Sequence, residues 1–270
     1  MAKVYIGVGH GGSDCGAVAN GFRESDLNLA VSKACYNYLK ARGVQVKISR
    51  TKDASVWLET RIKEANAFGA DLALDIHHNA GGGDGAEVFH TKNGGKGKVL
   101  AENILGEMKK IGQNSRGTKV RLNEKGQDYF GFIRQTDMPA VLVECAFIDN
   151  KTDLKIVDTA KERQKMGEAI AKAILKTLGI EDIIIKEKKG YTGTFPKLPE
   201  KGYLGKGDTG TQVKNLQKFL NWYGGYKLDV DGDFGPKTLE AVKDFQSKTG
   251  LDDTGRFGKK SLAKAKTITK

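Results

Sequence analysis

Cysteine is scarce in this chain of 270 residues, and the three cysteines, Cys15, Cys35 and Cys145, form no C-x-x-C pair. An odd number of cysteines without metal-ligand spacing argues against a disulfide framework and against a cysteine-based zinc site. No stretch approaches the roughly 18 apolar residues of a membrane span, so we expect no membrane insertion. The first residues lead straight into Val4-Tyr5-Ile6 and leave no room for a Sec signal peptide. We therefore expect synthesis in the cytoplasm without a signal peptide.

Acidic residues are also few, because the chain has 33 Asp and Glu but 45 Lys and Arg, which gives a net charge of +12. This balance favours a polyanionic partner, and nucleic acid, acidic lipid and anionic cell-wall polymer all qualify. The chain has no zinc-finger spacing, no aromatic RNA-binding motif and no Arg-rich block. A nucleic-acid partner would rest on charge alone, and we expect none. The lysine excess equally fits an ordinary solvated surface.

Strand and helix patterns alternate along the first two-thirds of the chain. Apolar or alternating runs predict strands at residues 4–8, 44–48, 72–76, 86–90 and 140–143. Helical periodicity predicts a helix from a cap at Ser25 to Gly43, and further helices over about residues 58–68, 98–111 and 161–178. A β-α-β-α-β beginning is typical of an α/β domain with a mostly parallel twisted sheet flanked by helices.

A change in composition separates a second unit from the first. Residues 181–202 turn to charge and proline without a helical period, which indicates a linker. Beyond this segment, apolar faces predict helices at 212–222 and 237–248 and a short C-terminal helix. We therefore predict a large α/β domain at 1–180, a linker at 181–202 and a small all-α domain at 203–270.

Three apolar runs end in residues that can carry chemistry, namely His10, His77 and Glu144. The carboxyl ends of parallel strands meet at one edge of a sheet, so these side chains can share a crevice with Glu24, which stands at a helix entrance. Catalytic zinc takes three His or carboxylate ligands and leaves a position for water, and His10, Glu24 and His77 match that count. Glu144 is the candidate to accept and return the proton of an attacking water. The constellation indicates a zinc-dependent hydrolase.

Each of these residues also has an ordinary interpretation by itself. His10 could cap a loop, Glu24 could interact with the helix dipole, and Glu144 could belong to a buried ion pair. His78 competes with His77, because successive strand residues point to opposite faces and only one of them can reach a given site. The joint placement of the four residues weakens these ordinary interpretations.

Ordered motifs surround the candidate residues between about residues 4 and 178. They are Gly9-His10-Gly11-Gly12 with Asp14, Glu24 with Leu27-Asn28-Leu29, Arg61 with Ala65-Asn66, Ile76-His77 with Asn79-Ala80, and Pro139-Ala140-Val141-Leu142-Val143-Glu144. In this order they resemble the zinc-dependent N-acetylmuramoyl-L-alanine amidases of the type 3 group, which occur in bacterial autolysins and phage endolysins.

This resemblance implies Zn²⁺ ligation by His10, Glu24 and His77, and catalysis by Glu144. The spacing to Asn79 in the family motif selects His77 over its neighbour, and we expect Asn79 to contact the substrate. Two positions depart from the family pattern. Cys15 stands where a proline is common, and His78 stands where a small residue usually follows the ligand.

A second set of motifs lies between about residues 203 and 251. It comprises Gly207-Asp208, Leu216-Gln217, Val230-Asp231-Gly232, Phe234-Gly235-Pro236-Lys237-Thr238 and Phe245-Gln246. These motifs resemble a peptidoglycan-binding type 1 domain, which implies peptidoglycan as the partner. Asp229, Asp231 and Asp233 with Glu240 approximate the spacing of a calcium loop, but Phe234 replaces the required glycine, so we expect a plain turn.

Together the resemblances imply zinc-dependent hydrolysis of the amide between N-acetylmuramic acid and L-alanine in peptidoglycan. We expect a monomeric, endolysin-like protein that is made in the host cytoplasm and acts at the cell wall after release. A zinc peptidase that cleaves stem peptides would use similar groups. A non-catalytic wall-binding protein is the other alternative, although all four catalytic positions are filled.

Overall fold

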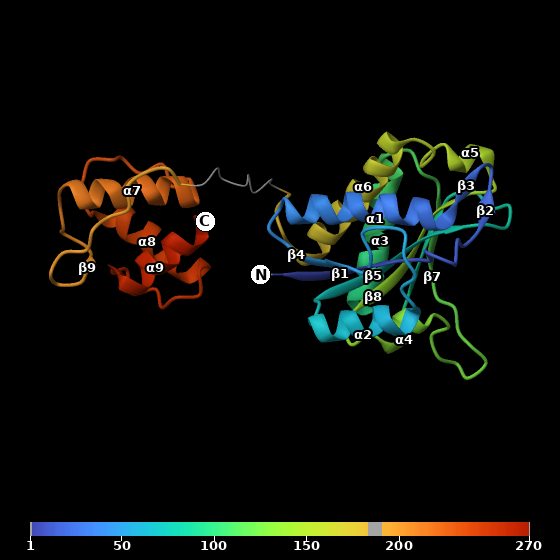
Figure 1. Ribbon diagram of the computed structural model, residues 1–270. Helices are drawn as coiled ribbons and strands as arrows, with labels where there is room; N and C mark the ends of the chain where they lie inside the picture. Colours follow the sequence, from blue (N-terminus) through green and yellow to red (C-terminus); the bar gives the residue numbers. More distant parts are fainter. Residues whose placement is uncertain (1, 183–190, 270) are drawn as a thin grey trace. The chain divides into compact units, whose positions relative to one another are not determined.

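The computed structural model describes residues 2–182 and 191–269 and divides into two compact units, Met1–Ile185 and Lys186–Lys270 (Figure 1). Each unit has a hydrophobic core of its own. The predicted linker at 181–202 lies in part outside the described residues, and the predicted domain bounds stay a prediction.

A six-stranded sheet forms the centre of the first unit, in the order β4-β1-β5-β8-β6-β7. The strands are β1 (Lys3–Val8), β4 (Gln45–Ile48), β5 (Leu72–Asn79), β6 (Ala86–His90), β7 (Ser115–Lys119) and β8 (Ala140–Phe147). Strands β4, β1, β5 and β8 are parallel, whereas β6 runs antiparallel to β8 and β7 runs parallel to β6. This confirms the predicted α/β fold. The sequence pattern misses β7, because Ser-Arg-Gly-Thr-Lys contains no alternating apolar residues.

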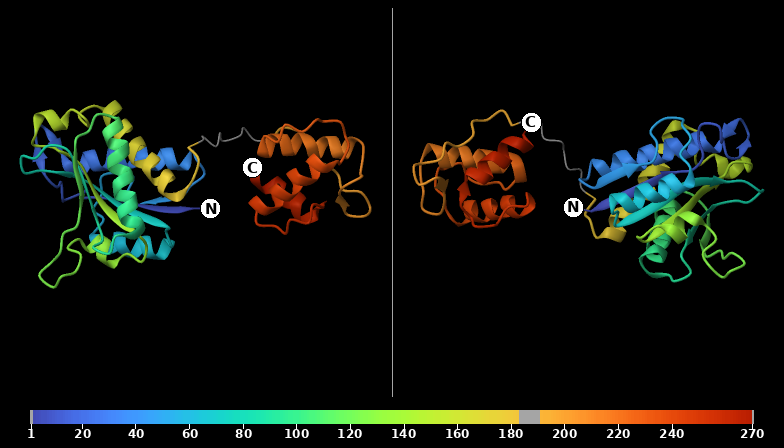
Figure 2. Two further views of the ribbon diagram at one scale, coloured as in Figure 1. Left: turned by 180° about the vertical axis from the view of Figure 1, so that it is seen from behind. Right: turned by 60° about the horizontal axis from the view of Figure 1, so that its bottom comes forward.

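Helices cover both faces of this sheet (Figures 1 and 2). On one face, α1 (Glu24–Lys40), α3 (Gly95–Lys110) and α6 (Ala160–Leu178) bury the larger core. On the other face, α2 (Leu58–Phe68) and α4 (Gly131–Gln135) cover a smaller core around Tyr5 and Phe132. The connections contain the short helix α5 (Lys151–Leu154) and the hairpin of β2 (Val18–Ala19) and β3 (Phe22–Arg23). No helix in the described ranges is long and apolar enough to cross a membrane.

The beginning of α1 corrects one expectation. Ser25 is not the cap; it lies in the first turn, and Arg23 occupies the cap position without a side-chain cap bond. The backbone N–H groups of Glu24 and Ser25 donate instead to the backbone oxygens of Ala17 and Cys15. The preceding loop therefore satisfies free donors of the first turn, and it fixes Glu24 at the point where the helix begins.

The second unit is a small helical module. Its helices are α7 (Thr211–Gly224), α8 (Pro236–Lys248) and α9 (Lys259–Ile268), with a two-stranded sheet of β9 (Tyr203–Leu204) and β10 (Phe257–Gly258). Phe219 and Phe245 are fully buried at its centre. Tyr191, Phe195 and Leu198 pack against this core, so the described end of the predicted linker shares the packing of the second unit.

The second unit also contains an internal repeat. Gln217 in α7 and Gln246 in α8 are both buried, and each accepts a 2.9 Å hydrogen bond from the N–H of a glycine in the following loop, Gly232 and Gly255 respectively. The amide Nε2 groups donate to Asp231 Oδ1 and Asp233 O in the first loop, and to Thr254 Oγ1 and Arg256 O in the second. The two loops are thus built alike. Asp231 Oδ1 accepts a hydrogen bond from Gln217 Nε2, and this use of its carboxylate within the loop supports the expected plain turn.

Candidate metal centre

Strand alternation sorts the side chains of the central strands onto two faces. Leu74 and Ile76 of β5 face the larger core, and His77 points to the opposite face. His77 is paired in register with Glu144 of β8, and Glu144 is paired with Glu87 of β6. Side chains of directly paired residues lie on the same face of a sheet. His77, Glu144 and Glu87 therefore form a row across three neighbouring strands.

The glycine-rich loop after β1 brings His10 to this row. His10 has a φ of 57°, a left-handed conformation that residues other than glycine rarely adopt. Two glycines leave the space that the site needs. A Cβ on Gly9 would lie 2.3 Å from His77 Cε1, and a Cβ on Gly16 would lie 2.6 Å from Glu24 Oε2. The left-handed conformation of His10 is strained, and such backbone strain persists where the surrounding structure holds it, commonly at functional sites.

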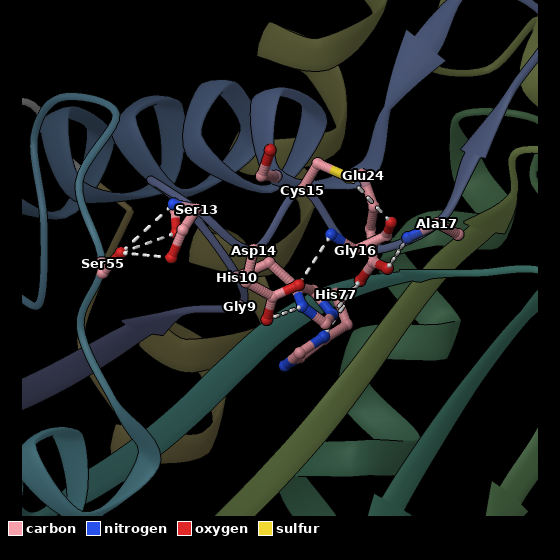
Figure 3. A network of polar contacts seen from close by, with 12 residues as sticks. Gly9, His10, Ser13, Asp14, Cys15, Gly16, Ala17, Glu24, Ser55 and His77 are labelled. Carbon is pink, nitrogen blue, oxygen red and sulfur yellow. Dashed lines mark hydrogen bonds and ion pairs between the residues drawn. The ribbon is translucent and has the colours of Figure 1, made fainter.

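The side chains of His10, Glu24 and His77 converge (Figure 3). Their potential ligand atoms all lie within 4.8 Å of one another, and no other such group of His, Cys, Asp or Glu occurs among the described residues. Glu24 Oε1 lies 3.2 Å from His10 Nε2 and 3.0 Å from His77 Nδ1. Two imidazoles and one carboxylate are the donor set of many catalytic zinc sites.

Electrostatics in this cluster suit a divalent cation. Burial alone would raise the pKa of Glu24, but its contacts with His10 and His77 outweigh burial and hold that pKa far below the ordinary value. The carboxylate is therefore ionised, as a ligand must be. For His77, burial lowers the pKa, but Asp75 and Glu24 raise it to about 10. The imidazole must lose a proton to bind a metal, so metal binding should release protons.

Each imidazole of the cluster also has its outer nitrogen against a second carboxylate. His10 Nδ1 lies 2.8 Å from Asp14 Oδ2, and His77 Nε2 lies 3.3 Å from Asp75 Oδ2. In metal sites, carboxylates in such positions fix the tautomer and orientation of the ligating imidazole. The arrangement leaves His10 Nε2 and His77 Nδ1 facing Glu24.

Asp75 is a site residue that sequence reasoning missed. It is buried, and its Oδ1 accepts a 2.7 Å hydrogen bond from Arg61 Nη1. A Cβ on Gly7 would lie 2.4 Å from the same oxygen, so β1 leaves room for the carboxylate. A signal was available, because Asp75 interrupts the apolar run Leu72–Ile76, and a charge in a buried strand needs a partner.

Glu144 provides the second acid of the row. Burial raises its pKa to about 7, and its Oε2 is buried without a hydrogen-bond partner among the described residues. A carboxylate in this state can take up and release a proton near neutral pH. An unsatisfied buried oxygen beside a metal-ligand cluster fits a group that works on water or substrate.

The remaining candidates occupy distinct places. His78 lies on the opposite face, where its Nδ1 donates to Asn28 Oδ1 at 2.7 Å and burial lowers its pKa to about 3. The imidazole of His78 is therefore outside the cluster that contains His77, and only its backbone N–H reaches the cluster, by donating to Glu24 Oε1 at 3.2 Å. Asn79 donates to Glu87 Oε1 at 2.9 Å, so it supports the row, and its contact with substrate stays a prediction. Cys15 is partly buried and donates to the backbone oxygen of Gly16.

An α/β domain that brings two imidazoles and two carboxylates together near the carboxyl ends of its parallel strands has an arrangement that fits a metal-dependent hydrolase. Comparison with known proteins makes the class specific. Residues 4–176 match the family model of N-acetylmuramoyl-L-alanine amidase, and residues 209–264 match that of a putative peptidoglycan binding domain.

Individual relatives agree with these matches. The chain is 34% identical over 271 residues to an endolysin of Bacillus phage SPP1, covering 93% of this chain and 95% of that protein. It is 35% identical over 184 residues to the N-acetylmuramoyl-L-alanine amidase CwlM of Bacillus licheniformis, covering 67% and 70%. The solved N-acetylmuramoyl-L-alanine amidase AmiC2 of Nostoc punctiforme is 30% identical, with a TM-score of 0.60 and coverage of 66% and 97%.

The chain therefore belongs to the N-acetylmuramoyl-L-alanine amidase family and carries a peptidoglycan-binding domain at its C-terminus. It is an endolysin-like hydrolase of the amide between N-acetylmuramic acid and L-alanine in bacterial peptidoglycan. These findings confirm the predicted enzyme class and substrate.

Proposed function

We propose that His10, Glu24 and His77 bind Zn²⁺ in this amidase and that Glu144 is its catalytic carboxylate. The convergence of the three ligand atoms within 4.8 Å carries the proposal. The family is generally zinc-dependent, and the ionised, buried Glu24 between two imidazoles fits that ion.

Each side chain then has a defined task. Zinc, when bound, supplies Lewis-acid polarisation of the scissile carbonyl and lowers the pKa of water. Asp14 and Asp75 hold the outer nitrogens of His10 and His77. Glu144 accepts a proton from the attacking water and passes it to the nitrogen of the leaving alanine, for which a pKa near neutrality is well matched.

The test compares the parent with Glu144→Gln on purified peptidoglycan. We expect the variant to retain one zinc per chain and to lose wall lysis by at least about 100-fold, the lower end of general acid–base contributions. Glu102→Gln is a matched control, because that side chain is 55% exposed on α3. Full turbidity clearance by Glu144→Gln would remove Glu144 from the mechanism.

Product analysis separates this function from its alternatives. An amidase releases intact stem peptides with a free L-alanine amine, whereas a peptidase leaves alanine attached to the muramic acid. A chelator should abolish release, and zinc should restore it. Peptides cut internally would favour the zinc peptidase, and absence of both zinc and products would favour the non-catalytic wall-binding protein.

The C-terminal domain is proposed to keep the catalytic unit at the insoluble wall. Linking two modules raises the effective concentration of the second module at the shared substrate. Similarity to a phage endolysin over nearly the full chain supports action at the wall of the phage host. Synthesis in the host cytoplasm, the monomeric state and the absence of a nucleic-acid partner stay predictions.

A further inference from the structure

The row of His77, Glu144 and Glu87, extended by His10, has chemically different surroundings at its two ends. The sheet order β4-β1-β5-β8-β6-β7 places His10 after β1, His77 on β5, Glu144 on β8 and Glu87 on β6. The proposed zinc ligands and Glu144 therefore lie at the inner strands β1, β5 and β8 of the sheet. One end is formed by the segment between β4 and α2, and the other by β7.

At the β4 end, an exposed tryptophan stands beside the cluster. Trp57 is 64% exposed and shares a hollow of about 180 Å³ with His10, Asp14, Ser55 and Arg61. The segment is held in place, because Ser55 Oγ donates to the backbone oxygen of the glycine that follows His10. An indole presents a large apolar face at little cost in conformational entropy, which makes it a strong contact for a ligand.

At the β7 end, two cations gather around Glu87. Lys119 Nζ and Arg116 Nε lie 2.5 and 3.0 Å from Glu87 Oε2. Both side chains remain more than one-third exposed, at 35% and 39%. Arg116 and Lys119 carry two positive charges against the one carboxylate of Glu87. These three residues therefore keep a net positive charge that is accessible to a substrate.

We propose that these two ends orient the substrate: the muramic acid sugar stacks on Trp57, and the stem peptide runs toward Arg116 and Lys119. The proposal rests on the proposed function and adds a direction to it. The uncharged N-acetylated sugars present apolar C–H faces that suit an indole. The free carboxylates of the substrate belong to the stem peptide, so its complement is the cationic end.

Strand spacing sets the reach of the peptide. Strands lie roughly 4.8 Å apart, so β7 is about 10 Å from β8 and about 14 Å from β5. An extended chain covers roughly 3.3 Å per residue, so three or four residues span this interval. Arg116 and Lys119 should therefore meet a carboxylate within the first residues of the stem peptide.

The sugar end is tested by fluorescence, which does not depend on turnover. The chain has two tryptophans, so Trp222→Phe leaves Trp57 as the sole reporter. In that background with Glu144→Gln, the N-acetylglucosamine–N-acetylmuramic acid disaccharide should change the emission of Trp57, and the free stem peptide should not. A response to the peptide alone, or to neither ligand, would overturn the assignment.

Kinetics on a soluble disaccharide-peptide provide a second measure of the sugar end. Trp57→Ala should raise KM about tenfold, typical of an aromatic anchor, and Trp57→Phe should recover most of the loss. Val99→Ala is the matched control, because Val99 is 47% exposed on α3 at the opposite face. An unchanged KM for Trp57→Ala in an active protein contradicts the proposal.

The peptide end is tested by changing Arg116 of the protein and, separately, the carboxylates of the stem peptide. Arg116→Gln leaves Glu87 bonded to Lys119 and Asn79, so the row stays intact. It should raise KM roughly three- to fivefold on a stem peptide with free carboxylates, as an exposed ion pair would, and have no effect on the amidated peptide. Lys98→Gln on α3 is the control for loss of one exposed cation.

An equal change on the free and amidated peptides would show that Arg116 acts only through Glu87, and this would overturn the proposed orientation. Failure of the proposed function looks different. In that case the parent releases no stem peptide from the wall, whereas a failed orientation leaves the parent active.

Discussion

Asp75 connects stability with the proposed metal binding through two contacts that can be separated. It is 1% exposed, pairs with Arg61 at 2.7 Å and lies 3.3 Å from His77 Nε2. Asp75→Leu leaves the Arg61 guanidinium buried without its partner, which costs about 3–5 kcal/mol. That is a large part of a typical unfolding free energy of about 5–15 kcal/mol. The same change removes the outer partner of His77, which typically weakens metal binding by roughly 10- to 100-fold.

A double variant separates the two effects. Arg61→Met with Asp75→Leu replaces the buried ion pair by apolar side chains, which often restores stability or increases it. We expect urea unfolding of the zinc-free double variant to approach that of the parent. Zinc affinity, measured by competition with a chromophoric chelator, should stay reduced, because His77 still lacks its carboxylate.

The outcome that refutes this reasoning is specific. If the stable double variant binds zinc as tightly as the parent, the contact between Asp75 and His77 does not orient the imidazole. Asp26→Leu is the control for removal of a surface carboxylate, because Asp26 is 57% exposed and lies 3.8 Å from Arg23. It should change stability by less than about 1 kcal/mol and leave zinc affinity unchanged.

Four further substitutions test other parts of the structure. Gly9→Ala places a Cβ 2.3 Å from His77 Cε1, so it should lower zinc affinity in the chelator assay, and unchanged affinity would contradict the packing. The pKa of Glu144 is raised from 4.5 to about 7 by burial, so the folded protein holds a proton that the unfolded chain releases between those values. Stability from this group falls as pH rises through that window, and zinc-free Glu144→Gln should exceed the parent in urea resistance at pH 8 but not at pH 4. Gln217→Leu and Gln246→Leu each leave loop groups unpaired and should each destabilise the second unit by about 1–3 kcal/mol in thermal unfolding, and equal melting of parent and variants would refute the repeat as a stabilising device.

Much of the catalytic unit could be predicted from sequence because its signals are local. Apolar runs with a period of two and helices with a period of 3.6 give the alternating elements, and the motifs around His10, His77 and Glu144 mark three central strands. The strands expected to end before His77 and Glu144 continue to Asn79 and Phe147, so both side chains lie within strands. Glu24 could be placed at a helix entrance because that signal is also local. The predicted cap of that helix was wrong, because backbone oxygens of the preceding loop, rather than the Ser25 side chain, accept hydrogen bonds from the free N–H groups.

The rest of the site depends on which strands become neighbours. The sequence alone shows that His77 and His78 point to opposite faces, but only the packing of α1, α3 and α6 shows which face is the larger core. Glu87, Arg116 and Lys119 enter through β6 and β7, and β7 has no apolar pattern of its own.

The sequence by itself placed His10, His77 and Glu144 in or shortly after central strands, because backbone periodicity and short motifs are properties of neighbouring residues. Only the tertiary structure decided the partners of those residues. Asp75 pairs with Arg61 of α2, Glu24 of α1 lies beside His10 and His77, and Glu144 is paired in register with Glu87. Each of these pairings joins separate segments of the chain. Such contacts follow from the register of the whole sheet, which no local pattern encodes.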